Sequence, residues 1–252
     1  MVTYELRPLS VGEILDGALV LLRRHFTLVL SIAVVCEGIP TAMDVYIDLM
    51  GGASEVPGLS LLERVLTLVG SVLVTGATVY VVSEAYLGRT PLFGDAMRFA
   101  SRRFGVILGA RFMSGFLTVM ATLALVIPGI FVACGYSVVA EAAALESGTS
   151  GEALGRSWDL TKGSRWKAFA LGAISIGLIL AVYAGGGVLG GILAGVMGGL
   201  DTVLAVFAAV VSLAIYPVLS CVFTLFYYDL RVRKEGFDLE MLSRQLGAGA
   251  AT

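Results

Sequence analysis

Residues 10–30 have the pattern of a short amphipathic helix that runs directly into an apolar one. One helical face carries apolar residues at positions i, i+3, i+4, i+7 and i+11: Val11, Ile14, Leu15, Ala18 and Leu22. The other face carries charged residues: Glu13, Asp16, Arg23 and Arg24. Ser10 and Glu13 have the spacing of a capping box, which predicts that the helix begins there. Such a helix can lie at a membrane surface before the chain enters the bilayer.

The same pattern recurs twice further along the chain. A second copy begins at Thr90-Pro91, since Pro is favoured at the first helical position. Its apolar stripe is Phe93, Ala96, Met97, Ala100 and Phe104, and its opposite face carries Arg98, Arg102 and Arg103. A third, weaker copy begins with the capping-box spacing of Thr149 and Glu152 and ends near Lys162. We therefore expect three surface helices.

Composition places this chain among membrane proteins. Hydrophobic residues make up 58% of the 252 and charged residues only 14%, whereas a soluble domain has about 25% charged residues. A helix needs about 20 apolar residues to cross the hydrocarbon core of a bilayer. Six apolar runs approach or exceed this length, and they predict spans at residues 26–45, 62–86, 104–127, 129–145, 166–190 and 203–228. The third and fourth are joined only by Ile127-Pro128-Gly129, which predicts a tight hairpin.

Each predicted surface helix precedes two predicted spans. The three resulting units cover about 10–87, 90–146 and 149–230, with a tail at 229–252, and their uneven spacing indicates a degenerate repeat. The sequence thus predicts an all-α, polytopic membrane protein with a single integral membrane domain over residues 1–252. Its six transmembrane helices would form three hairpins, each preceded by a cytoplasmic-face amphipathic helix and related by rotation about the membrane normal.

The distribution of basic residues predicts the orientation. Of the 17 Lys and Arg residues, all but Arg64 and Arg111 lie in the N-terminal segment, in residues 87–103 and 146–167, or in the C-terminal tail. The opposite side is mainly acidic, with Asp44, Asp48, Glu55, Glu63 and Asp201. By the positive-inside rule both termini are expected to be cytoplasmic.

A stripe of glycines follows the fifth predicted span. Gly187, Gly191, Gly195 and Gly199 stand four residues apart, and small residues at this spacing let helix backbones approach closely. The main interpretation of residues 184–199 is packing within the molecule. A flexible or re-entrant segment and a homo-oligomer face are the alternatives.

Three sequence blocks carry a resemblance to a known family. They are residues 6–16 with 24–26, residues 156–158 with 160–163, and residues 228–231 with 233–239. Together they resemble the bacterial family named for the membrane domain of glycerophosphoryl diester phosphodiesterases. In the proteins that gave the family its name, a separate soluble barrel carries out hydrolysis. The resemblance therefore implies a multi-pass module of the bacterial cytoplasmic membrane, and it carries over no catalytic activity.

Residues suited to catalysis are scarce. The sequence has no HExxH, GxSxG or CxxC motif, and its single histidine, His25, stands beside Arg24 at the end of a predicted surface helix. The three cysteines lie in apolar runs and do not predict a disulfide framework: Cys36, Cys134 and Cys221. The basic loops lack the interleaved aromatic residues of a nucleic-acid platform. We expect no enzyme, no catalytic residue, no metal, no cofactor and no nucleic-acid partner.

Ionisable residues at membrane depth are the first set of candidate site residues: Glu37, Glu84, Arg111, Glu141 and Asp229. Glu37 lies near the middle of the first span and is followed by Pro40, which removes a helix hydrogen bond. The other three acids recur near cytoplasmic span ends. Their common position suggests an acidic ring beneath the three surface helices. They are interpreted as helix-end acids bonded to Arg and Ser of the neighbouring surface helix, with a substrate or proton path as the alternative. Arg111 is predicted to form a salt bridge with Glu141 or Glu84.

Basic residues where surface helices meet spans are the candidate contacts for lipid headgroups: Arg23, Arg24, Arg102, Arg103, Arg165 and Lys167. They could instead serve only to set topology. The function hypothesis is a non-enzymatic membrane protein that organises lipids or a partner complex and binds anionic phospholipid headgroups at the cytoplasmic face. Its expected partners are membrane lipids, and a membrane protein or a second copy at the glycine face. The alternatives are a small transporter that uses Glu37 in a Pro-broken first helix, and, less favoured, a membrane-embedded lipid-phosphodiester enzyme.

Overall fold

A computed structural model describes residues 9–86, 88–197 and 200–236. Within these residues the chain forms nine helices and no strand, which confirms the predicted all-α fold. The helices are α1 (Val11–Arg24), α2 (Phe26–Leu49), α3 (Pro57–Tyr86), α4 (Phe93–Ala124), α5 (Val126–Gly135), α6 (Val139–Leu145), α7 (Ser150–Thr161), α8 (Arg165–Met197) and α9 (Leu200–Glu235). Six segments are long and apolar enough to cross a membrane, the fourth being α5 together with α6.

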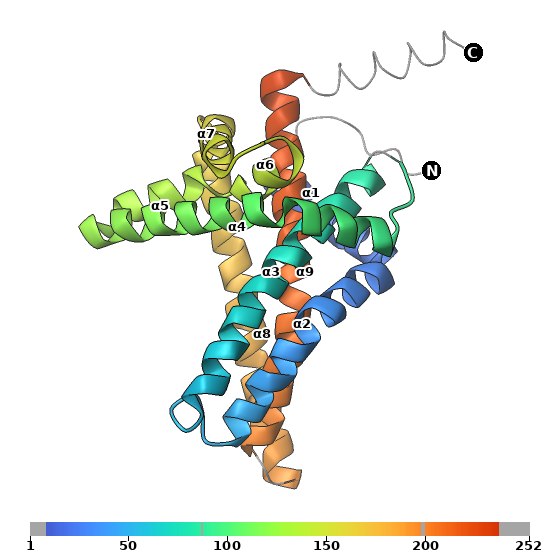
Figure 1. Cartoon of the computed structure of the whole chain (residues 1–252), viewed down its shortest axis with the longest axis vertical. Helices are drawn as coiled ribbons and strands as arrows, with labels where there is room; N and C mark the ends of the chain where they lie inside the picture. Colours follow the sequence, from blue (N-terminus) through green and yellow to red (C-terminus); the bar gives the residue numbers. More distant parts are fainter. Residues whose placement is uncertain (1–8, 87, 198–199, 237–252) are drawn as a thin grey trace.

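The long helices do not all run in the same direction. Figure 1 shows α2, α3, α8 and α9 along the longest axis of the molecule, whereas α4 and α5 lie across it, near the end that holds α1, α6 and α7. Contacts between α2 and α3, α2 and α9, and α8 and α9 hold the lengthwise helices together. This arrangement differs from three equivalent hairpins, because the middle hairpin crosses the other two.

The capping boxes predicted for α1 and α7 are both present. The side chain of Ser10 accepts a hydrogen bond from the backbone N–H of Glu13, and Thr149 and Glu152 repeat the arrangement. The apolar stripe of α1 does not face outward over its whole length. Ile14 is fully buried, and Gly17 brings α1 close to the side chain of Leu225 in α9. The first amphipathic helix therefore packs on protein along part of its apolar face.

The second predicted surface helix is not a separate element. Thr90 and Pro91 precede α4, which begins at Phe93 and continues without a break to Ala124. Its first third is held against α3, where a Cβ atom at Gly76 would lie 3.2 Å from the Cα of Ala100. Because the helix is unbroken, the segment predicted as the third span follows the direction that this crossing imposes.

The predicted fourth span is broken into two helices. The turn expected at 127–129 lies at Leu125, whose backbone is extended, because Pro128 is tolerated within the first turn of α5. α5 then ends at Gly135, and α6 begins at Val139, after three intervening residues. The hydroxyl of Ser157 in α7 donates a hydrogen bond to the carbonyl oxygen of Gly135 at 3.0 Å. This bond from α7 satisfies a backbone acceptor at the end of α5.

The glycine-rich segment is helical as far as Met197, and Gly199 lies outside the described residues. Its packing face is displaced from the predicted one. A Cβ atom at Gly186 would lie 1.7 Å from the ring of Phe207 in α9, whereas one at Gly187 would meet nothing within 4 Å. Gly190 and Gly191 repeat this difference. Packing within the molecule therefore uses the neighbouring glycines, and the predicted stripe is open at Gly187 and Gly191.

Candidate functional site

The described parts of the three sequence blocks behind the family resemblance meet at one end of the molecule, called the basic end below (residues 9–16, 146–167 and 227–235). The fully buried side chain of Asp229 accepts a hydrogen bond from the backbone N–H of Leu9 at 2.7 Å. The same carboxylate pairs with Lys167 and, at 3.0 Å, with Arg233. Both cations also donate to the carbonyl oxygen of Leu9. One carboxylate thus joins the segment before α1 to α8 and α9.

A second ionic cluster at the basic end is centred on Glu146, which follows α6. Glu146 pairs with Arg156 of α7 and, at 3.1 Å, with Arg231 of α9. It also accepts a hydrogen bond from the hydroxyl of Tyr227, while Arg156 makes a second pair with Glu235. Burial alone would raise the pKa of Glu146. The hydrogen bonds from Arg156 and Tyr227 and the charges of Arg156 and Arg231 outweigh it, so the pKa is lowered.

The structure divides the predicted headgroup contacts into two groups. Lys167 is occupied by Asp229, and Arg103 donates a hydrogen bond to the carbonyl oxygen of Ser147 at 2.8 Å. These two cations hold the fold together. The others are three exposed residues, Arg23, Arg24 and Arg102, and the half-buried Arg165.

Arg165, the first residue of α8, is held between two aromatic rings. Its guanidinium carbon lies 4.0 Å from the ring centroid of Phe131 in α5 and 4.1 Å from that of Trp158 in α7. Its Nε atom is buried and has no hydrogen-bond partner, and no carboxylate in the described part of the chain lies within ion-pairing distance. The next residue, Trp166, is 79% exposed. The stacking fixes the plane of a guanidinium whose charge has no acidic partner among these residues.

Contacts between α5 and α7 position the ring of Trp158. A Cβ atom at Gly135 would lie 2.5 Å from this ring, so only glycine allows the observed approach. The bond from Ser157 to the Gly135 carbonyl ties the two helices at the same level. The rings of Tyr136 and Phe131 also contact Trp158. The break after α5 therefore helps to build the aromatic pair around Arg165.

A polar cavity of about 540 Å³ lies between α3, α4, the α5–α6 break and α9. Arg111 lines it, but the predicted salt bridge to Glu141 or Glu84 is wrong. Arg111 instead donates through Nη1 to the hydroxyl of Thr75 at 3.1 Å and, more weakly, to the carbonyl oxygen of Ser71 at 3.4 Å. Its partners lie on α3 because α4 crosses that helix, an arrangement that antiparallel spans of equal depth would not produce.

Glu141 lines the same cavity without a cationic partner. The residue is 3% exposed, and no Lys or Arg in the described residues lies within 4.0 Å of its carboxylate. Ser220 of α9 faces the cavity too, and its hydroxyl oxygen is buried without a hydrogen-bond partner. The polar part of the lining is completed by Thr75, Ser114, Tyr136, Ser137 and Tyr216. The cavity therefore contains two opposite charges that do not touch.

The remaining acids occupy different settings. Glu37 is 4% exposed, and its Oε1 is buried without a partner, where α2 passes Gly70 of α3 so closely that a Cβ would contact it at 3.0 Å. Glu37 does not line the polar cavity, so this cavity does not supply the polar path that transport through Glu37 requires. Glu84 pairs with the exposed Arg89 at 3.5 Å. Glu84, Glu141 and Asp229 therefore differ in their partners.

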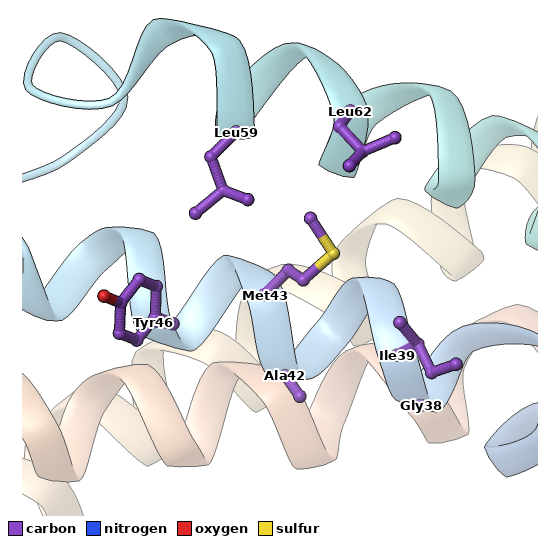
Figure 2. A pocket seen from close by; sticks show the side chains of 7 residues that line it. All are labelled: Gly38, Ile39, Ala42, Met43, Tyr46, Leu59 and Leu62. Carbon is purple, nitrogen blue, oxygen red and sulfur yellow. The ribbon is translucent and has the colours of Figure 1, made fainter.

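A second cavity, of about 650 Å³, lies between the ends of α2 and α3 that are far from α1. Figure 2 shows Met43 pointing from α2 toward α3, with Leu59 and Leu62 on the opposite helix. Apart from the hydroxyl of Tyr46, the side chains that line it are apolar. This cleft offers no charged group to a ligand.

The sequence did not predict the residues that contact Arg165 and Arg111. Phe131 and Trp158 are brought to Arg165 by tertiary packing, for which the sequence has no local signal. The partners of Arg111, in contrast, have a local signal in the sequence. Ser71 and Thr75 stand four residues apart and therefore on one face of a largely apolar helix, a pattern that marks a polar contact inside a bundle.

No group of three or more His, Cys, Asp or Glu residues suited to a metal ion occurs in the part of the chain that the structure describes. Comparison with family models, curated proteins and solved structures finds no match for the chain.

Proposed function

We propose that this chain is a non-enzymatic integral membrane protein that binds anionic phospholipid headgroups at the basic end, and in this way organises lipids or a partner complex. The observation that carries the proposal is the stacking of Arg165 between Phe131 and Trp158. A fixed, planar guanidinium can present two N–H groups to one phosphate, and Arg is well suited to this bidentate geometry.

Two further features support a headgroup site at this position. Arg165 begins a span, and the exposed Trp166 beside it stacks on Phe169, as aromatic residues at a membrane interface do. The N–H groups of Lys167 and Ala168 donate to the carbonyl oxygen of Ser164, and the dipole at this start of α8 favours an anion. Exposed Arg23, Arg24 and Arg102 add to the positive charge of this side of the chain.

We place the basic end on the cytoplasmic side of a bacterial cytoplasmic membrane, with both termini on that side. The bias of Lys and Arg supports this orientation. The proposed kinship with the membrane domains of glycerophosphoryl diester phosphodiesterases rests on the resemblance of the three sequence blocks.

The test measures binding of phosphatidylglycerol to the purified chain in detergent by native mass spectrometry. A single juxtamembrane cation contributes about 1 kcal/mol, so Arg165→Gln is expected to weaken binding about five-fold. Arg165→Lys, which keeps the charge and loses only the planar fork, should weaken it less than Arg165→Gln does. The matched control is Arg64→Gln, which removes the same charge from an exposed position within the first turns of α3.

Equal binding by wild type and Arg165→Gln would contradict the proposal, and so would equal losses in Arg165→Gln and Arg64→Gln. The proposal that the chain is not an enzyme is tested by a separate assay. We expect no hydrolysis of glycerophosphodiesters by the purified chain, with or without divalent metal ions, and metal-dependent turnover that Glu37→Gln or Asp229→Asn abolishes would overturn it.

A further inference from the structure

The polar cavity around Arg111 and Glu141 lies apart from Arg165 and has a different charge pattern. Arg111 donates hydrogen bonds through Nη1 to two oxygen atoms of α3. Glu141 has no cationic partner within 4.0 Å among the described residues. A buried charge that is left unpaired costs several kcal/mol. Both groups nevertheless line one cavity of about 540 Å³, within the size range of small-molecule sites. The arrangement suits a ligand that reaches both charges.

We propose that this cavity binds a zwitterionic lipid headgroup that carries a phosphate and a primary ammonium, as in a phosphatidylethanolamine. The phosphate pairs with Arg111, and the ammonium donates hydrogen bonds to Glu141. A purely anionic headgroup would be attracted by Arg111 but repelled by Glu141. A simple cation would be attracted by Glu141 but repelled by Arg111. A zwitterion satisfies both groups and leaves the total charge of the occupied site unchanged.

The hydroxyl of Ser220 supports the presence of a ligand. Its oxygen is buried and has no hydrogen-bond partner, although buried hydroxyls are normally bonded, and the residue lines the cavity from α9. The missing hydrogen-bond partner of Ser220 is supplied by a phosphate oxygen or by the ammonium group of the bound headgroup. A primary ammonium has three N–H donors for Glu141 and Ser220, whereas the quaternary ammonium of choline has none.

The apolar part of the lining points to a lipid and away from a soluble zwitterion. Val119, Ala133, Leu219 and Phe223 form this part. Val119 is 54% exposed, so the apolar side of the cavity is open to the surroundings of the helices, from which an acyl chain can enter. A free phosphoethanolamine would leave these side chains without a partner.

The experiment measures lipid binding by native mass spectrometry in the Arg165→Gln chain, so that the proposed headgroup site at the basic end contributes less. Short-chain phosphatidylethanolamine, phosphatidylcholine and phosphatidylglycerol are compared with soluble phosphoethanolamine. We expect phosphatidylethanolamine to bind at least ten-fold more tightly than the other three. Adding Glu141→Gln should abolish this preference, and adding Ser220→Ala, which breaks no observed hydrogen bond, should weaken phosphatidylethanolamine binding about three-fold or more. The control, Glu84→Gln, removes an acid that pairs with exposed Arg89 and should leave binding unchanged.

Equal binding of phosphatidylglycerol or phosphatidylcholine would overturn the inference, as would a preference that survives Glu141→Gln, or soluble phosphoethanolamine binding as tightly as the lipid. Loss of binding in Glu141→Gln counts as support only if that variant keeps the wild-type melting temperature within a few degrees. If the melting temperature of Glu141→Gln falls further, the effect of Ser220→Ala on phosphatidylethanolamine binding decides whether the inference holds. Binding of phosphatidylglycerol at Arg165, measured in the Glu141→Gln chain with Arg165 intact, tests the proposed function separately.

Discussion

The backbone N–H of Leu9 donates a hydrogen bond to the buried carboxylate of Asp229, 220 residues further along the chain. The same carboxylate also pairs with Lys167 and Arg233. The link closes the basic end, because it ties the segment before α1 to the last turns of α9. Asp229 is therefore a structural acid, although its partners are Lys167 of α8, Arg233 of its own helix and the Leu9 backbone, and not the expected Arg and Ser of a surface helix.

Replacing Asp229 should destabilise the protein strongly. Asp229→Ala leaves Lys167 and the Leu9 N–H without their partner, and breaking a buried ion pair costs about 3–5 kcal/mol. We expect a loss of free energy of unfolding near the lower end, about 3 kcal/mol, since Arg233 is partly exposed. The measurement is denaturant unfolding in detergent. Glu84→Ala is the matched control, because its partner Arg89 is exposed and the loss should stay below about 1 kcal/mol. Equal losses in the two variants would show that the Asp229 link does not stabilise the fold.

Gly135 should not tolerate a side chain. Gly135→Ala places a Cβ atom 2.5 Å from the ring of Trp158, and overpacking of this kind costs about 1–3 kcal/mol. Because the ring also stacks on Arg165, binding of phosphatidylglycerol should weaken at the same time. Gly172→Ala in α8 is the control, since nothing lies within 4 Å of the new atom. Unchanged stability and binding in Gly135→Ala would mean that α5 and α7 are not packed as described.

Glu146 should make the protein sensitive to acid. Its pKa is lowered in the folded state from the ordinary value of 4.5 by its bonds to Arg156 and Tyr227, so the carboxylate stabilises the fold fully above that value. The contribution is lost as the pH falls through the lower, folded-state pKa. In melting curves from pH 7 to pH 3, Glu146→Gln should be less stable than wild type at neutral pH, and the difference should close below about pH 4.5. A difference that is independent of pH would contradict this role.

Local patterns in the sequence predicted the helical fold, the six apolar segments and the capped starts of α1 and α7, because these depend on spacing within one or two turns. The direction of α4 could not be predicted in this way. It depends on the close crossing at Gly76 and Ala100, which is a contact between two helices. The same crossing gave Arg111 partners on α3 and left Glu141 unpaired.

The sequence predicted which types of residue form the candidate site, but not how these residues are arranged in space. The six basic candidates look alike in the sequence, yet Lys167 and Arg103 hold the fold while Arg165 stacks between rings. That distinction depends on Phe131 and Trp158, which the break after Gly135 brings together. The glycine stripe shows the same limit on a smaller scale, since Gly186 packs on Phe207 and Gly187, one residue later, does not.

The central claim is that the basic end faces the cytoplasm, where its free cations meet anionic headgroups. It is tested most directly by labelling single cysteines in intact bacterial cells with a membrane-impermeant maleimide, after Cys36, Cys134 and Cys221 are replaced by Ala. The exposed positions are Ser54, between α2 and α3, and Gly151, at the start of α7. The account predicts that Ser54→Cys is labelled in intact cells and Gly151→Cys only after the membrane is permeabilised. Labelling of Gly151→Cys in intact cells, with Ser54→Cys protected, would contradict it.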